Sequence, residues 1–116
     1  MSIAPEEVLD YLLDAPGHQR HDPDWIESVE TTIFEEDTWT FIEVPLDKLL
    51  LMPINARAKR YARLRTPYPP IIVFQTRLGD FEVLDGNARA NAARLRSDRC
   101  IGAYVPERLA RRLSGC

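Results

Sequence analysis

Residues 81–93 of the chain read FEVLDGNARANAA, a run in which an extended segment passes directly into a helix. Phe81 to Leu84 have the composition of a strand, and Ala88 to Leu95 have the alanine-rich composition of a helix. Gly86 stands between the two segments. Glycine permits the tight turn and the close approach of backbone that such a junction needs. This strand–glycine–helix unit is the part of the sequence from which we expect chemistry.

The start of the predicted helix has the properties of an anion site. Its first turn offers backbone N–H groups without helical partners, together with the positive end of the helix dipole. Arg89 lies within reach of that end and could add a two-pronged hydrogen bond to an oxyanion. We therefore predict phosphate binding at Gly86, Asn87 and Arg89. The alternative is that the glycine only makes the turn, as in many α/β connections.

The rest of the chain alternates between helical and extended patterns. Pro5 and the acids that follow it start a short amphipathic helix that ends near Pro16, and Asp22 is a plausible N-cap for a second helix through Val29. The segment 31–44 favours extended structure, most strongly from Trp39 to Val44. Further predicted elements are a helical turn at 46–50, a helix at 55–64, strands at 71–74, 81–84 (the second arm of a hairpin) and 100–105, and a basic helix at 106–113.

Charge is divided very unevenly along the chain. The first 50 residues carry 13 acidic and 2 basic side chains, and the remaining 66 carry 5 acidic and 13 basic ones. The basic part suits a partner that carries phosphates, and the acidic part could shield that surface or repel nucleic acid. The alternative is that the two parts simply neutralise each other in the fold. Among the apolar residues of the first part, we expect Ile33, Phe34, Trp39 and Phe41 to lie in the core rather than in an interface.

Several classes of protein and site are disfavoured by the composition. The apolar run from Leu49 stops at Pro53, far short of a membrane-spanning helix, and the first residues lack the features of a signal peptide, so we expect a cytoplasmic protein and no membrane among its partners. The two cysteines have no metal-type or redox-type spacing, and reduced thiols are expected. One loop contains imidazole and carboxylate side chains that could bind a metal ion: His18, His21, Asp22 and Asp24. A solvated loop without a metal explains these residues better.

The motif residues carry a resemblance to the ParB/sulfiredoxin superfamily, over residues 41 to about 106. Its most specific part is the Gly86-x-x-Arg89-x-x-Ala92-Ala93 pattern directly after a strand. In ParB-type partition proteins this motif reads Gly-Glu-Arg-Arg and binds the triphosphate of CTP. In sulfiredoxin it reads Gly-Cys-His-Arg and binds ATP phosphates beside the reactive cysteine. The resemblance implies an α+β fold, a small mixed β-sheet packed with helices, comprising residues 39–116, with residues 1–38 as an acidic extension within one compact unit.

The resemblance assigns roles one residue at a time. Gly86 and Arg89 keep the phosphate-binding roles, whereas Asn87 replaces the cysteine of sulfiredoxin and so removes the nucleophile of that chemistry. Asn87 also replaces the glutamate of the partition proteins. Ala88 replaces an arginine or histidine that would add a donor, which predicts weaker phosphate affinity. Three further residues match the family more loosely. Asn55 and Arg57 match the Asn-Pro-Arg box of the partition proteins, and Lys59 falls where sulfiredoxin-like proteins place a phosphate-contacting lysine. Asp85 is a candidate Mg²⁺ ligand, or alternatively the N-cap of the helix.

Three functions therefore remain open at the level of the sequence. The first is a nucleotide-binding domain that takes ATP or CTP with Mg²⁺, with NTPase or phosphotransfer activity left undecided. The second is a non-enzymatic regulatory or interaction protein, of plasmid, phage or immunity type, whose nucleotide site has degenerated and whose partner is a protein. The third is DNA binding or a nuclease. DNA binding is not favoured, because the helix-turn-helix that follows in partition proteins is missing and the acidic third opposes phosphate contacts.

Overall fold

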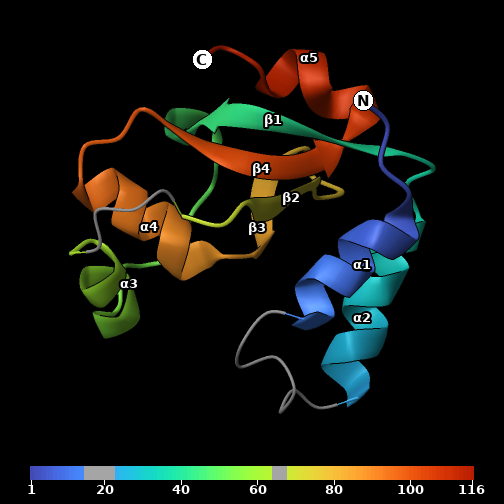
Figure 1. Cartoon of the computed structure of the whole chain (residues 1–116), viewed down its shortest axis with the longest axis horizontal. Coiled ribbons are helices and arrows are strands. Elements are labelled where there is room, and N and C mark those ends of the chain that lie inside the picture. Colours follow the sequence, from blue (N-terminus) through green and yellow to red (C-terminus); the bar gives the residue numbers. More distant parts are fainter. Residues whose placement is uncertain (15–22, 64–67) are drawn as a thin grey trace.

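Four strands form one mixed sheet in the order β1-β4-β2-β3 (Figure 1). The computed structural model describes residues 1–14, 23–63 and 68–116. The strands are β1 (Trp39–Pro45), β2 (Ile71–Gln75), β3 (Phe81–Asp85) and β4 (Cys100–Pro106). The strands predicted at 39–44, 71–74, 81–84 and 100–105 are therefore confirmed, with ends that differ by a residue or two.

The topology follows from the lengths of the connections. The tight turn at Gly79 joins β2 to β3 as an antiparallel hairpin, and β4 runs antiparallel to β1. By contrast, β2 and β4 are parallel, and a parallel pair needs a long crossover, which here contains β3 and α4 (Asn87–Leu95). The predicted α+β class and the small mixed sheet are confirmed. The strand–glycine–helix unit lies on this crossover.

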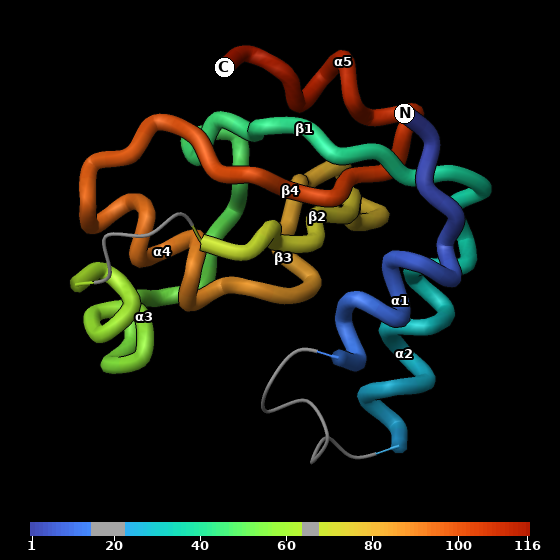
Figure 2. Tube along the Cα trace, in the orientation of Figure 1, coloured from blue at the N-terminus to red at the C-terminus, as the bar shows by residue number. Residues whose placement is uncertain are grey.

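The helices pack on both faces of the sheet. On β2, Ile71 and Val73 enter a core formed with α4 and the C-terminal elements, while Ile72 between them enters a second core formed with the N-terminal helices. Figure 2 shows α1 and α2 side by side at one end of the molecule, with α3 and α4 at the other. The helical bounds are α1 Pro5–Asp14, α2 Pro23–Phe34, α3 Ala56–Tyr61 and α5 Ala110–Leu113, with 3-10 turns at Leu46–Lys48 and Glu107–Leu109.

One predicted segment has the wrong secondary structure. Residues 31–34 were expected to be extended, but α2 continues through them to Phe34. Val29 and Ile33 are four residues apart and both are buried, so a helical face, rather than a strand, places them in the core. The hydroxyls of Thr31 and Thr32 donate to carbonyls four residues earlier, so a helix also satisfies these polar groups.

The expected core residues divide into two groups. Ile33 and Trp39 are completely buried, which confirms the prediction for them, and the Trp39 indole donates to the carbonyl of Ile33 over 3.2 Å. Phe34 and Phe41, in contrast, are 46% and 47% exposed, so their assignment to the core was wrong. The Phe41 ring instead lies beside Gly102 on the neighbouring strand, where an added Cβ would stand 3.0 Å from two of its ring atoms.

The expectation of reduced thiols is also wrong, because Cys100 and Cys116 form a disulfide with Cα atoms 6.3 Å apart. The C-terminal tail returns to the start of β4 and is held there by two basic side chains. Lys48 donates to the carbonyls of Arg112 and Ser114, and Arg99 donates to the carbonyl of Gly115. The spacing of the cysteines in the sequence does not reveal this return of the tail.

Among the described residues, an ion pair links the two oppositely charged parts of the chain. Arg108 forms a forked contact with the Glu36 carboxylate, with both distances 2.7 Å. Much of the remaining acid lies on the exposed sides of α1 and α2, away from α3 in Figure 1. Among the described helices, none has the length and apolar character needed to cross a membrane.

Candidate functional site

The junction between β3 and α4 requires glycine for two geometric reasons. Gly86 caps α4 in the left-handed conformation, with φ of 101° and ψ of 23°. A Cβ atom at this position would stand 2.6 Å from Cγ2 of Ile71 and 2.9 Å from Nη2 of Arg89. A side chain is therefore both strained and obstructed here. Because Gly86 itself is the N-cap and no side chain caps the helix, the alternative of Asp85 as N-cap is not borne out.

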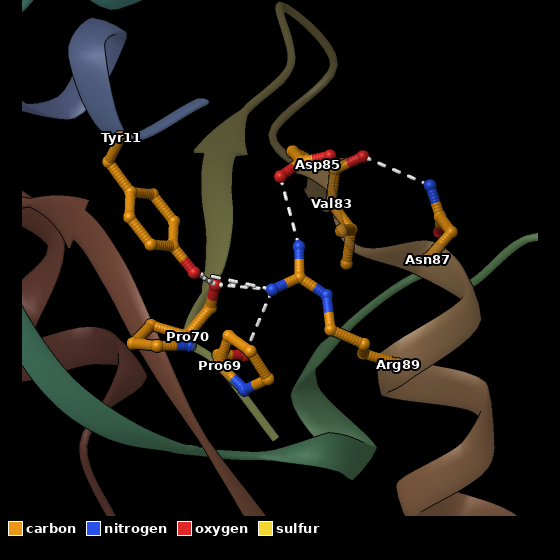
Figure 3. A network of polar contacts seen from close by, with 7 residues as sticks. All are labelled: Tyr11, Pro69, Pro70, Val83, Asp85, Asn87 and Arg89. Atoms are coloured by element: carbon orange, nitrogen blue, oxygen red, sulfur yellow. Dashed lines mark hydrogen bonds and ion pairs between the residues drawn. The ribbon is translucent and has the colours of Figure 1, made fainter. Parts of the chain in front are cut away.

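Arg89 is the centre of a polar network at this junction (Figure 3). Its Nη2 donates to the carboxylate of Asp85 over 3.0 Å. Its Nη1 donates to the carbonyls of Pro69 and Pro70, over 3.1 and 3.0 Å, and lies 3.3 Å from the hydroxyl of Tyr11. The Arg89 and Asp85 side chains are only 11% and 7% exposed. The guanidinium is thus close to the helix start, as predicted, but four protein groups accept its hydrogen bonds.

Tyr11 is a member of this network that sequence reasoning did not identify. Its hydroxyl donates to the carbonyl of Pro70 over 2.5 Å and accepts from Arg89. Burial is the main cause that raises the pKa of the Tyr11 hydroxyl, while the hydrogen bond from Arg89 acts in the opposite direction. The ring also packs edge-on against Tyr104 of β4, with centroids 5.0 Å apart. The only signal in the sequence was a tyrosine three residues after Val8, on the side of α1 that turns inward.

Asn87 has its side chain turned toward the protein. The amide nitrogen donates to the carbonyl of Val83 over 3.2 Å (Figure 3), and Oδ1 is buried without a hydrogen-bond partner among the described residues. The neighbouring Ala88 contributes no polar group. In this arrangement the first turn of α4 offers an anion its backbone amides, but no side-chain donor from positions 87 and 88.

The remaining predicted phosphate-binding residues belong to α3, which packs against α4. Asn55 caps α3, because its side-chain oxygen accepts from the backbone N–H of Ala58 over 2.9 Å. Arg57 lies over the ring of Tyr61, 5.8 Å from its centroid, and Lys59 is exposed. Within the described part of the chain, no hydrogen bond or ion pair links these three side chains to Arg89. The structure therefore brings together Asp85, Gly86, Asn87 and Arg89, with Asn55, Arg57 and Lys59 on the adjoining helix.

The described residues give little support to the metal sites proposed from the sequence. No group of three or more His, Cys, Asp or Glu side chains suited to a metal ion is present in residues 1–14, 23–63 and 68–116. His18, His21 and Asp22 lie outside the described residues, and Asp24 is exposed on α2. The Asp85 carboxylate, proposed as a Mg²⁺ ligand, is paired with Arg89.

A cleft of about 420 Å³ opens over β1, the start of β4 and the C-terminal end of α4. Its walls include Phe41, Glu43 and Gly102 from the sheet, and Tyr68 and Arg96 from the connections. The Arg96 guanidinium lies 4.9 Å from the centroid of the Tyr68 ring. None of the predicted phosphate-binding residues lines this cleft. It shares only Pro70 with the Arg89 network.

Comparison with known proteins finds a similar fold but no close relative. No family model and no curated protein matches the chain. Among solved structures, the chain is similar to sulfiredoxin from Arabidopsis thaliana, with 19% sequence identity and a TM-score of 0.45, over 57% of this chain and 83% of that one. A likeness of this degree concerns the fold alone and carries no argument about chemistry.

Proposed function

We propose that the chain binds the phosphates of a nucleotide at the β3–α4 junction. The observation that carries this proposal is the convergence of two groups at one turn. Gly86 adds no side chain at the first amides of α4, and the Arg89 guanidinium lies directly beside the same glycine, with Nη2 2.9 Å from the position a Cβ would take. Backbone amides at a helix start together with an arginine fork form a common arrangement for binding phosphate.

Arg89 has a donor left for such a ligand. Its Nε has no acceptor among the described residues, and the contacts through Nη1 are made to neutral carbonyl and hydroxyl oxygens. A phosphate oxygen is a stronger acceptor than either, because hydrogen bonds between charged groups are about twice as strong as neutral ones. Arg57 and Lys59 would add positive charge from the adjoining helix, although Asn55 is occupied as a cap. Mg²⁺ would accompany the phosphates, and Asp85, which directly precedes Gly86, would supply a carboxylate at the turn.

The test is a calorimetric titration with ATP and with CTP, each in the presence of Mg²⁺. Arg89→Lys keeps the charge but loses the planar fork, and we expect it to weaken binding about tenfold. Arg94→Lys is the matched control, since Arg94 lies on the same helix and is exposed. Phosphate release measured on the same samples decides whether the chain is also an enzyme. Absence of heat at millimolar nucleotide, or equal binding by Arg89→Lys and the wild type, would overturn the proposal.

A second candidate is supported by a different observation. The Arg89–Asp85 pair is buried, and both nitrogens Nη1 and Nη2 are already bonded within the protein. This is the arrangement expected if the superfamily fold has lost its nucleotide and Arg89 serves only to hold the fold together. The chain would then act as an interaction protein. The same titration separates the two, because this candidate predicts no heat with either nucleotide.

A further inference from the structure

The N-terminal helix α1 reaches the candidate phosphate site through one side chain. Tyr11 lies in the last turn of α1, and its hydroxyl touches both Nη1 of Arg89, at 3.3 Å, and the carbonyl of Pro70, at 2.5 Å. The rest of α1 is attached by apolar contacts, in which Val8 and Leu12 are fully buried. Docking of α1 and the position of the Arg89 guanidinium are therefore linked by a direct contact.

Binding of a phosphate would compete with this contact. The Nη1 group has two N–H bonds and three acceptors within reach, so it is saturated by the two prolyl carbonyls and Tyr11. An oxyanion held by the free Nε and the first amides of α4 draws the guanidinium toward the helix start. The contacts of Nη1 with neutral acceptors then give way more readily than the contact of Nη2 with Asp85, because that pair is charged and buried. The acceptor contributed by α1 is among those displaced.

Charge acts in the same direction. Residues 5–14 of α1 contain four carboxylates, Glu6, Glu7, Asp10 and Asp14, and no basic side chain. A phosphate held at Arg89 adds negative charge close to a helix that already carries a net charge of −4, and like charges repel. Without a bound phosphate, the last turn of α1 contacts the positively charged guanidinium through the Tyr11 hydroxyl. Phosphate binding thus adds negative charge beside the end of α1.

We propose that docked α1 holds the Arg89 site closed, and that phosphate binding and α1 docking oppose each other. This inference rests on the proposed phosphate site. The coupling is reciprocal, so whatever loosens α1 tightens phosphate binding by the same factor. The ligand class is a nucleoside triphosphate or an inorganic polyphosphate, since only phosphate oxygens take part in the exchange. The acidic extension then acts as a built-in competitor of the ligand.

The test compares two tyrosine-to-phenylalanine variants of the full chain. Tyr11→Phe removes the hydroxyl that contacts Arg89, and we expect it to bind ATP–Mg²⁺ and inorganic tripolyphosphate about fivefold more tightly, which corresponds to one ordinary hydrogen bond. Tyr68→Phe is the control, because it also deletes a hydroxyl that donates to a carbonyl, that of Tyr61, but leaves Arg89 untouched. Its affinity is expected to equal that of the wild type.

A second measurement uses the wild type alone and does not depend on any variant. Amide hydrogen exchange of α1 is followed with and without saturating tripolyphosphate, and we expect the exchange of residues 8–13 to become faster when the ligand is bound. Binding with unchanged α1 exchange and equal affinity of Tyr11→Phe would overturn the coupling but leave the phosphate site standing. No binding by the wild type or by Tyr11→Phe would overturn both the site and the coupling.

Discussion

Replacement of Arg89 by alanine tests whether the network at the β3–α4 junction holds the fold together. The variant removes four hydrogen bonds at once, among them the charged contact of Arg89 with the Asp85 carboxylate, which is 7% exposed. Removing one member of a buried ion pair costs about 3–5 kcal/mol, because the other charge stays buried and loses that stabilising contact. We expect a loss of stability in this range.

The same pair can be assigned its own energy through a double-mutant cycle. Asp85→Ala leaves the guanidinium without its carboxylate, and the double variant leaves neither charge behind. We therefore expect the double variant to lose about 2 kcal/mol less stability than the sum of the losses in the two single variants. A coupling energy of this size is within the range for contacting residues.

The assay is urea-induced unfolding followed by tryptophan fluorescence, since Trp39 is completely buried and reports the loss of the core. Arg94→Ala is the control, because this arginine is exposed on the same helix, and a surface substitution changes stability by no more than about 0.5 kcal/mol. A cost below about 1 kcal/mol for Arg89→Ala, or strict additivity in the cycle, would refute the reasoning. It would mean that in solution the guanidinium is not held by these contacts.

Three further outcomes follow from the geometry. Gly86→Ala is expected to lower the free energy of unfolding in urea by about 2–4 kcal/mol, because the new Cβ meets Ile71 and the residue has a positive φ. Gly79→Ala, with φ of 94° but no atom within 4 Å of the new Cβ, is expected to cost only about 1–2 kcal/mol. Equal costs would contradict the obstruction at Gly86. Reduction of the Cys100–Cys116 disulfide, checked by thiol titration, is expected to lower stability by about 3 kcal/mol through the entropy of a loop of this length, and thiols that react without reductant would contradict the bond. Leu12→Ala, at a fully buried position of α1, is expected to cost about 2–5 kcal/mol in the same unfolding assay, and a near-neutral effect would show that α1 is not docked.

Local patterns predicted most elements of the fold. The apolar run Ile71–Phe74 and the alternation after Asp80 specify strands by themselves, and the prolines and glycines that bound them mark the turns. The failure at residues 31–34 has a clear cause. Threonines and β-branched residues favour strands when isolated, but burial of Ile33 beside Val29 overrode that preference.

The candidate site was only half predictable from the sequence. Gly86 and Arg89 were identified because they lie three residues apart on one short junction, so a local pattern contains both. Tyr11 lies 78 residues before Arg89, and the contact between them exists only because α1 packs on the sheet face that Ile72 enters. No local pattern carries information on such a pair.

The sequence by itself determined the succession of strands and helices along the chain, the need for glycine at position 86 and the uneven distribution of charge. The tertiary structure alone decided how the Arg89 guanidinium is used, that the tail returns to form the disulfide with Cys100, and that Phe41 remains outside the core. The physical reason is the range of the interactions involved. Backbone preference and hydrophobic periodicity act over a few residues, whereas a side chain chooses its hydrogen-bond partners and its burial among groups that only the folded chain brings within reach.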